Sequence, residues 1–166
     1  MRSNWGVDRA VDNFLLSKVI FESAPSILRN GQPLEVVGAR IVGPVDFRAS
    51  IIARPIYFRS CLFTDMIDCT DAQIVSMSFE NCRLGELRLR YAQIAGSLLI
   101  RDCEVSRPLD LLSARIARDV DLRGCNRSHP GRVKVSRLRF ERLTWSLRIG
   151  ANRILPLMCL VDSPQS

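Results

Sequence analysis

The sequence has little of what catalytic sites are built from. Its 166 residues include a single histidine, His129, and contain no glycine-rich phosphate loop or dinucleotide fingerprint. Nucleophilic catalysis needs a base beside the nucleophile, and a lone histidine in a turn-like Ser-His-Pro-Gly loop offers little for such a reaction. We therefore expect no enzyme activity, no catalytic residue, no cofactor and no small-molecule substrate.

Long apolar runs are also missing. No stretch of eighteen uncharged apolar residues occurs, and residues 1–8 lack the apolar run of a secretory signal. We expect a cytoplasmic protein, with attachment to the periphery of a membrane as the alternative. The six cysteines are then expected to be free thiols rather than a disulfide framework. No Cys-x-x-Cys pair occurs, so we expect no metal site.

Negative charge is scarce in only one part of the chain. Residues 1–125 carry 16 basic and 15 acidic side chains, whereas residues 126–166 carry 8 and 2. The net charge of +7 therefore belongs mainly to the C-terminal quarter. A basic end of this kind either is simply solvated or meets nucleic-acid phosphates or anionic lipid headgroups.

What the sequence does contain is an internal repeat. Ten copies of the unit Φ-x-Φ-x-x-small-x-Φ, where Φ is a large apolar residue, lie between Leu34 and Phe140, and the ninth lacks its last apolar residue because Arg127 stands there. Successive units follow at ten or eleven residues, apart from one insertion containing His129. The alternation Φ-x-Φ is typical of a short strand with one buried face. Turn-forming residues stand between units, at Gly43-Pro44, Pro55, Gly85, Gly96 and Pro108.

The small position of the repeat indicates how many units make one coil. It alternates between two series, namely Ala39, Cys61, Cys82, Cys103, Cys125 and Ser50, Ala72, Ala92, Ala114, Leu138. Two units per coil would stack each series in its own column, with a third column of Ile52, Ile74, Ile94 and Ile116. The sequence therefore predicts an all-β solenoid, a right-handed parallel β-helix of about five coils with 21–22 residues each.

Both ends of such a solenoid need caps. Residues 7–21 are predicted to form an N-terminal capping α-helix whose apolar stripe faces the first coil, made of Val7, Ala10, Val11, Phe14, Leu15, Val19 and Ile20. We divide the chain into an N-terminal helical cap (1–31), a β-helix repeat domain (32–150), and an apolar C-terminal segment with a tail (151–166). The apolar run 154–161 caps its own core, pairs with a second copy, or is the remnant of a longer parent.

The inward Ala or Cys and Leu or Phe positions resemble those of the pentapeptide-repeat β-helices, although these coils are one or two residues longer. A closer likeness is to pentapeptide-like proteins of actinobacteria and their relatives, which are often labelled membrane-associated oxidoreductase. It covers roughly residues 7–125 and is carried by the segments 34–47 (LEVVGARIVGPVDF) and 55–63 (PIYFRSCLF). The resemblance implies a rigid scaffold, and it brings no catalytic signature that can be placed on this chain.

Two sets of side chains have both a functional and a structural interpretation, and we compare the two for each set. The cysteine column would place thiols about 4.8 Å apart, but a linear stack cannot surround an ion tetrahedrally, so we expect small polarizable core residues. Outward carboxylates could serve acid/base catalysis, but they share their columns with arginines, which favours a solvated and partly paired surface. These carboxylates are Asp46, Asp68, Asp110 and Asp121.

The basic C-terminal quarter supplies the candidate binding site. In the strand-like run 133–149 the apolar residues have inward phase, so five basic residues are expected to face outward as an anion-binding surface: Arg132, Lys134, Arg139, Arg142 and Arg148. The leading functional hypothesis is a non-catalytic scaffold or protein-interaction module with an unidentified protein partner or self-association through the coil ends. The alternatives are a binder of anionic surfaces, membrane or nucleic acid, and an oxidoreductase as the family label implies.

Overall fold

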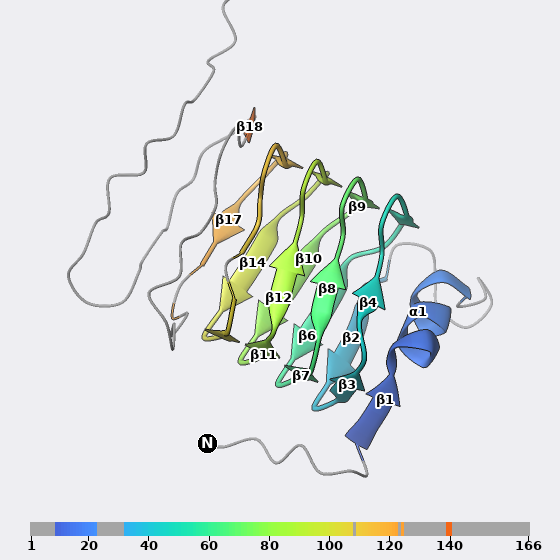
Figure 1. Ribbon diagram of the computed structural model, residues 1–166. Coiled ribbons are helices and arrows are strands. Elements are labelled where there is room, and N and C mark those ends of the chain that lie inside the picture. Colours follow the sequence, from blue (N-terminus) through green and yellow to red (C-terminus); the bar gives the residue numbers. More distant parts are fainter. Residues whose placement is uncertain (1–8, 23–31, 108, 123, 125–138, 141–166) are drawn as a thin grey trace, which may run out of the picture.

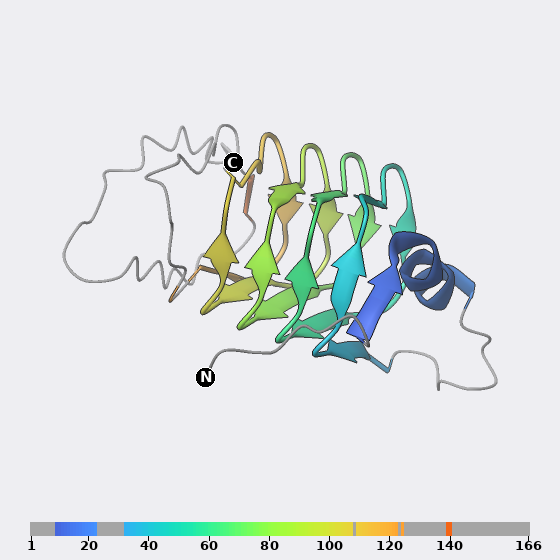
Figure 2. The ribbon, with the colours of Figure 1, turned by 60° about the horizontal axis from the view of Figure 1, so that its bottom comes forward.

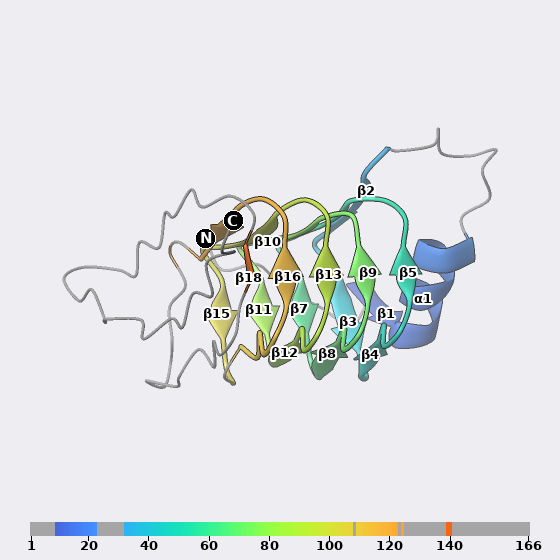
Figure 3. The same ribbon diagram turned by 90° about the horizontal axis from the view of Figure 1, so that it is seen from above.

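The computed structural model describes residues 9–22, 32–107, 109–122, 124 and 139–140. The chain forms a parallel β-solenoid of about four turns with one short helix at its N-terminal end (Figure 1). From one turn to the next it passes behind, below, in front of and above the axis of Figure 1, which makes the solenoid right-handed (Figures 1 and 3). The predicted fold class is confirmed.

Four sheets surround the core, and every pairing between strands is parallel. Sheet A contains β1 (Ala10–Asp12), β3 (Arg40–Val42), β7 (Leu62–Phe63), β11 (Arg83–Leu84) and β15 (Glu104–Val105). Sheet B contains β2 (Leu34–Val37), β6 (Ile56–Arg59), β10 (Met77–Glu80), β14 (Leu98–Arg101) and β17 (Val120–Asp121). Sheet C contains β4 (Val45–Asp46), β8 (Met66–Asp68) and β12 (Glu86–Arg88). Sheet D contains β5 (Ile51–Ile52), β9 (Gln73–Ile74), β13 (Gln93–Ile94), β16 (Arg115–Ile116) and β18 (Arg139–Phe140).

The register of the sheets confirms that two repeat units make one turn. In sheet B, Ile56 lies opposite Leu34, Met77 opposite Ile56, and Leu98 opposite Met77, at separations of 22, 21 and 21 residues. The predicted isoleucine column is continuous in sheet D, from Ile52 to Ile116. The expected fifth coil falls largely on residues outside the described part of the chain, as do residues 141–166.

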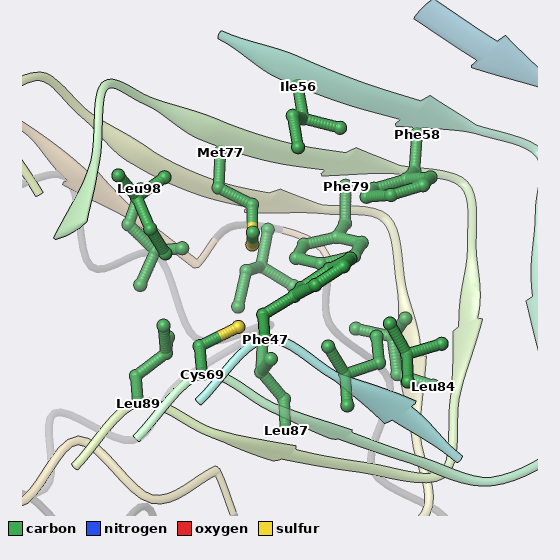
Figure 4. Close-up of a cluster of buried hydrophobic side chains, with 14 of the residues drawn as sticks. Phe47, Ile56, Phe58, Cys69, Met77, Phe79, Leu84, Leu87, Leu89 and Leu98 are labelled. Atoms are coloured by element: carbon green, nitrogen blue, oxygen red, sulfur yellow. The ribbon is translucent and has the colours of Figure 1, made fainter. Parts of the chain in front are cut away.

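Aromatic rings stack inside the solenoid because their positions repeat from turn to turn. The rings of Phe58 and Phe79 are stacked, with centroids 5.2 Å apart and planes 13° apart. Phe63 meets both of them edge-on, at 5.1 and 5.9 Å. Figure 4 shows Phe58 and Phe79 together with Phe47, whose side chain is also fully buried. The core is therefore a continuous apolar column along the axis.

Nine corners of the solenoid use a left-handed backbone conformation that the repeat pattern did not reveal. The residue before each small inward residue has a φ of about 50–70°, and only two of the nine are glycine: Gly38, Ala49, Ser60, Asp71, Asn81, Tyr91, Asp102, Ser113 and Gly124. At the four corners that lead into sheet D, a backbone hydrogen bond of 3.1–3.2 Å closes the turn across three residues, as from Ser50 N to Phe47 O. Non-glycine residues rarely adopt this conformation, so sequence patterns could not predict it.

The N-terminal cap differs from its prediction. Residues 10–12 form strand β1, which pairs with β3, and helix α1 (Asn13–Glu22) begins only after Asp12. Asp12 Oδ1 accepts a hydrogen bond of 2.7 Å from Leu15 N, so Asp12 caps the helix and separates it from the strand. The expected helix over 7–21 was therefore wrong at its start, and Val7 lies outside the described residues.

The buried side of α1 also differs from its prediction. Leu16 and Ile20, four residues apart, pack against the first coil and are almost fully buried. Of the expected stripe, Ile20 is buried as predicted, whereas Phe14, Leu15 and Val19 are exposed. The helix is apolar on more than one side, so periodicity alone could not choose the side that faces the coil.

Candidate functional site

The cysteine column is a chain of buried thiols. Cys61 N donates to Cys82 Sγ at 3.4 Å, and Cys82 Sγ lies 3.4 Å from Phe58 O and 3.3 Å from Glu80 O. The neighbouring thiol of Cys103, together with burial, raises the pKa of Cys82 to about 12. Contact with the Cys82 thiol and burial likewise raise the pKa of Cys61, and burial raises that of Cys69. The thiolate form is suppressed, so these cysteines are poor nucleophiles and poor metal ligands.

No group of three or more His, Cys, Asp or Glu side chains within the described residues is arranged to hold a metal ion. The four described cysteines, namely Cys61, Cys69, Cys82 and Cys103, are all free thiols. They occupy the core positions that the repeat predicted for them. Their arrangement is that of packing residues.

The outward carboxylates of sheet C hold turns. Asp46 Oδ1 accepts from Arg48 N at 3.0 Å, Asp68 Oδ1 accepts from Thr70 N at 3.0 Å, and Asp110 Oδ1 accepts from Leu112 N at 3.2 Å. Each is a turn in which an aspartate accepts from the backbone two residues later, just before a left-handed corner. These aspartates therefore have a structural role that repeats from coil to coil.

The same carboxylates are also paired with arginines. Arg88 lies 2.6 Å from Glu86 and 3.9 Å from Asp68, and Arg90 lies 2.7 Å from Asp110. The hydrogen bond from Arg48 lowers the pKa of Asp46 below its ordinary value. Four carboxylates and four guanidinium groups face one another on and beside sheet C: Asp46, Asp68, Glu86, Asp110, Arg48, Arg88, Arg90 and Arg107. The charge of this face is balanced internally.

Sheets A and B carry similar ladders on their outer faces. Arg59 lies between Glu35, at 3.0 Å, and Glu80, at 3.2 Å, so it joins three adjacent rungs of sheet B. Arg101 pairs with Asp121 at 2.7 Å in the same sheet. Arg83 pairs with Glu104 at 2.7 Å in sheet A. The predicted pairing of the outward charges is confirmed for sheets A, B and C. The prediction that they are solvated was wrong for three of the four candidate carboxylates, since Asp68, Asp110 and Asp121 are buried.

Within its four described coils, from β5 to β16, sheet D differs from the other three sheets in having no carboxylate among the outward positions. We call this surface the sheet D face; Figure 3 looks onto it. One outward column consists of Ile51, Gln73, Gln93 and Arg115, which lie opposite one another in register. A second outward column lies two residues further along each turn: Ala53, Val75, Ala95 and Ala117. All eight side chains are exposed except the half-buried Ala117.

Sequence reasoning missed the sheet D face, because it searched for charged and reactive side chains. The available signal was the pair of residues that flank each inward isoleucine of the third column. In the second and third coils these flanking residues are uncharged, Gln73 and Val75 around Ile74 and Gln93 and Ala95 around Ile94. A period-two pattern with uncharged residues on its solvent side indicates a sheet face that lacks the charged side chains which oppose association with another protein.

Most of the predicted anion-binding surface lies outside the described residues, namely Arg132, Lys134, Arg142 and Arg148. Arg139 belongs to β18, and the backbone register places it opposite Arg115 at the C-terminal edge of sheet D. Arg115 and Arg118 are both exposed, and neither forms an ion pair within the described part of the chain. Arg115 and Arg118 therefore add positive charge to this end of sheet D.

The one described helix, α1, is too short to cross a membrane. Comparison with known proteins found no matching family model, no matching curated protein and no matching solved structure. The function of this chain must therefore be inferred from its own surfaces. The resemblance to pentapeptide-repeat proteins stays a prediction.

Proposed function

We propose that this protein is a non-catalytic scaffold that binds a protein partner through the sheet D face. The observation that carries this proposal is the contrast between sheets. Sheets A, B and C carry ion pairs between adjacent rungs, whereas the outward columns of sheet D hold alanine, valine, isoleucine and glutamine in the first three coils. The sheet D face is where a partner meets the least charge.

The contrast matters because of desolvation. A partner that covers the ladder of Arg59 or the cluster around Arg88 must remove paired charges from water, which costs free energy unless every pair is replaced. A partner that covers the first three coils of the sheet D face, and stops short of Arg115, removes only apolar and amide groups from water, and Val75 and Ile51 contribute hydrophobic burial. The small side chains there lose little conformational entropy on binding, and the backbone beneath them is held by hydrogen bonds between turns.

The proposal is tested by placing one carboxylate on the sheet D face. Ala95→Glu adds a charge at its centre, and Ser78→Glu is the matched control, because it adds the same charge to the outer face of sheet B in the same coil. Proteins retained by the immobilised wild-type chain from its own cells would be identified, and the affinity of each measured with purified partner. We expect Ala95→Glu to weaken binding by about tenfold or more, and Ser78→Glu to leave it unchanged. Equal affinities for both variants would contradict the proposal.

A second function, binding of anionic surfaces, is favoured by one specific observation. Arg115 and Arg139 occupy directly opposed positions in sheet D, and like charges so placed are destabilising unless an anion lies between them. Nearby Arg118 is exposed as well. In this reading a protein of the cytoplasm attaches to the periphery of a membrane or to nucleic acid through the C-terminal coils.

Co-sedimentation with anionic and with neutral vesicles, at low and at physiological salt, tests this second function. We expect salt-sensitive binding to the anionic vesicles alone, reduced in the double variant Arg115→Gln with Arg118→Gln. Binding that is insensitive to salt, or unchanged in the double variant, would refute this second function. No described residue favours the oxidoreductase alternative, and it is not proposed.

A further inference from the structure

The sheet D face is uncharged at one end and basic at the other. Its outward positions in the first three coils are Ile51, Ala53, Gln73, Val75, Gln93 and Ala95. In the fourth coil Arg115 continues the first column, and Arg118 comes directly after Ala117 of the second column. The strands β5, β9, β13 and β16 lie side by side in Figures 2 and 3. Positive charge in the described part of this face is therefore confined to one end.

Within the described chain, neither arginine at that end has a counter-charge. Arg115 and Arg118 are exposed, and no described carboxylate forms an ion pair with either of them. Asp119, the carboxylate next to Arg118, accepts a hydrogen bond from Ser97 Oγ at 3.3 Å. The arginines of sheet B, by contrast, are paired across rungs. The two guanidinium groups can therefore accept a carboxylate that a partner brings.

The uncharged part of the face also carries amide groups. Gln73 and Gln93 lie opposite each other in register, and neither side-chain amide hydrogen-bonds to a described residue. In the hydrocarbon of a bilayer such an amide would lose its hydrogen bonds to water without replacement, which is unfavourable. A protein supplies both donors and acceptors to an amide, whereas nucleic-acid phosphates find no positive charge on the first three coils. The face therefore fits a protein better than a bilayer or a nucleic acid.

A second copy of the chain does not fit the same face. The described outward positions of the sheet D face contain no carboxylate, so two such faces packed together either oppose their arginines or place Arg115 against Ile51. The first arrangement is repulsive, and the second covers a guanidinium group without a counter-charge. The partner must therefore differ from this chain and bring negative charge of its own.

We propose that the partner of the sheet D face is an acidic protein segment. An apolar side chain of the segment lies against Ile51 or Val75, its middle meets the two glutamines, and its carboxylates reach Arg115 and Arg118. The inference rests on the proposed function, since it names the chemistry of the partner bound at that same site. Charge at one end alone also selects the direction in which the segment lies.

The spacing of the rungs sets the length of the segment. Ile51 and Arg115 are three rungs apart, which corresponds to about 14 Å along the axis at the usual spacing between strands. An extended segment covers this length in about four residues, and a helix in about ten. The carboxylates and the apolar side chain of the partner should be separated accordingly.

Selection from a phage-displayed library of short random peptides tests the inference. Peptides are kept when they bind the wild-type chain and not Ala95→Tyr, an uncharged obstruction at the centre of the face that favours neither sign of charge. We expect the kept peptides to be enriched in Asp and Glu, about four residues from a large apolar residue. Kept peptides without acidic residues would overturn the inference and leave the proposed function standing. A library without any peptide that distinguishes Ala95→Tyr would contradict both.

Two matched double variants measure the contribution of the arginines. Arg115→Gln with Arg118→Gln should weaken binding of a kept peptide by about fivefold or more. Arg9→Gln with Lys18→Gln is the control, because it removes two exposed positive charges at the opposite end of the solenoid, and it should leave the affinity unchanged. Equal affinities of the two double variants would overturn the inference.

A charge exchange then tests direct contact. Replacing the carboxylates of a kept peptide by lysine should abolish its binding to the wild-type chain, and Arg115→Glu with Arg118→Glu should restore it. Both positions are exposed, so an unchanged unfolding midpoint verifies that the variant folds. Failure of the exchanged pair to bind would show that the arginines do not contact the carboxylates.

Other occupants of the face give different results. Salt-sensitive binding of the wild-type chain to anionic vesicles or to an oligonucleotide, lost with Arg115→Gln and Arg118→Gln, would assign the arginines to the second function and overturn the inference. A wild-type dimer in sedimentation velocity that Ala95→Tyr dissociates would place a second copy on the face and would equally overturn it.

Discussion

The backbone N–H of Cys61 donates to Cys82 Sγ at 3.4 Å, and the two residues are one full turn of the solenoid apart. The contact joins a backbone donor to a thiol of the next coil, so the cysteine column contributes to the polar connections between turns as well as to packing. The thiols remain protonated well above neutral pH because contact with one another and burial raise their pKa values. Both their reactivity and the pH dependence of stability follow from this.

We predict that stability falls as the pH rises above about 9. The folded chain keeps the proton on Cys82, whose pKa is about 12, whereas the unfolded chain releases it near the ordinary thiol value of 9.0. The stabilising contribution is therefore complete below pH 9 and is lost between that value and about 12. Urea unfolding measured across this range should show a downward slope of up to about 1.4 kcal/mol per pH unit for each such thiol. Cys82→Ala should reduce this slope, and alanine fits the column because its first residue is Ala39. An unchanged slope would contradict the raised pKa of Cys82 as the cause.

Alkylation mapped by mass spectrometry gives an independent measurement of the same column. At pH 8 the buried cysteines should react only as fast as the chain unfolds, because thiol and not thiolate is present and solvent does not reach it. The peptides to follow contain Cys61, Cys69, Cys82 and Cys103. Rapid labelling of Cys61, Cys82 or Cys103 in the folded protein would show that the column opens without global unfolding, and rapid labelling of Cys69 would show the same for the core beside sheet C.

The phenylalanine stack predicts the most destabilising core substitution. Phe79 is fully buried between Phe58 and Phe63, so Phe79→Ala removes stacking and edge-on contacts and leaves a cavity. We expect a loss of about 3–5 kcal/mol in the free energy of unfolding. Tyr57→Ala, on the outer face of the same sheet, should cost no more than about 0.5 kcal/mol. Similar costs for the two substitutions would contradict the inward assignment of Phe79.

The left-handed corners predict that two exposed alanines respond oppositely to replacement by glycine. Ala49 has a φ of 51°, which costs an L-residue about 1–2 kcal/mol, so Ala49→Gly should be neutral or stabilising in thermal unfolding. Ala53, four residues later, is exposed as well and does not have a positive φ, so Ala53→Gly should destabilise by about 0.5–1 kcal/mol. The same sign for both substitutions would show that the corner is not strained at Ala49.

The turn-holding aspartates predict a difference between asparagine and alanine. Asp68 Oδ1 accepts from Thr70 N at 3.0 Å and from Thr70 Oγ1 at 2.6 Å. Asp68→Asn retains an acceptor oxygen, whereas Asp68→Ala leaves both Thr70 donors without it and should cost about 1–3 kcal/mol more in chemical denaturation. If the two variants unfold at the same denaturant concentration, the aspartate has no role in holding the turn.

The sequence determined the solenoid by itself, because burial in a stacked fold depends on periodicity. Each inward position is covered by the equivalent position of the next coil, so the alternation of Cys61, Cys82 and Cys103 with Ala72, Ala92 and Ala114 specified the length of a turn and the identity of each column. The partial pairing of outward charges followed from the same register, as the bridge from Arg59 to Glu80 shows.

Only the tertiary structure decided the features that do not repeat. Asp12 separates a strand from a helix because β3 offers Ala10–Asp12 a neighbour to pair with, and no local pattern reveals that neighbour. Leu16 rather than Phe14 faces the core because the first coil lies on one side of α1, and the sequence of an apolar helix does not specify that side. The sheet D face had a faint signal in the sequence, but only the structure brings its uncharged described positions, such as Gln73 and Gln93, together on one surface. Periodic neighbours are encoded by spacing along the chain, whereas unique neighbours are created by folding.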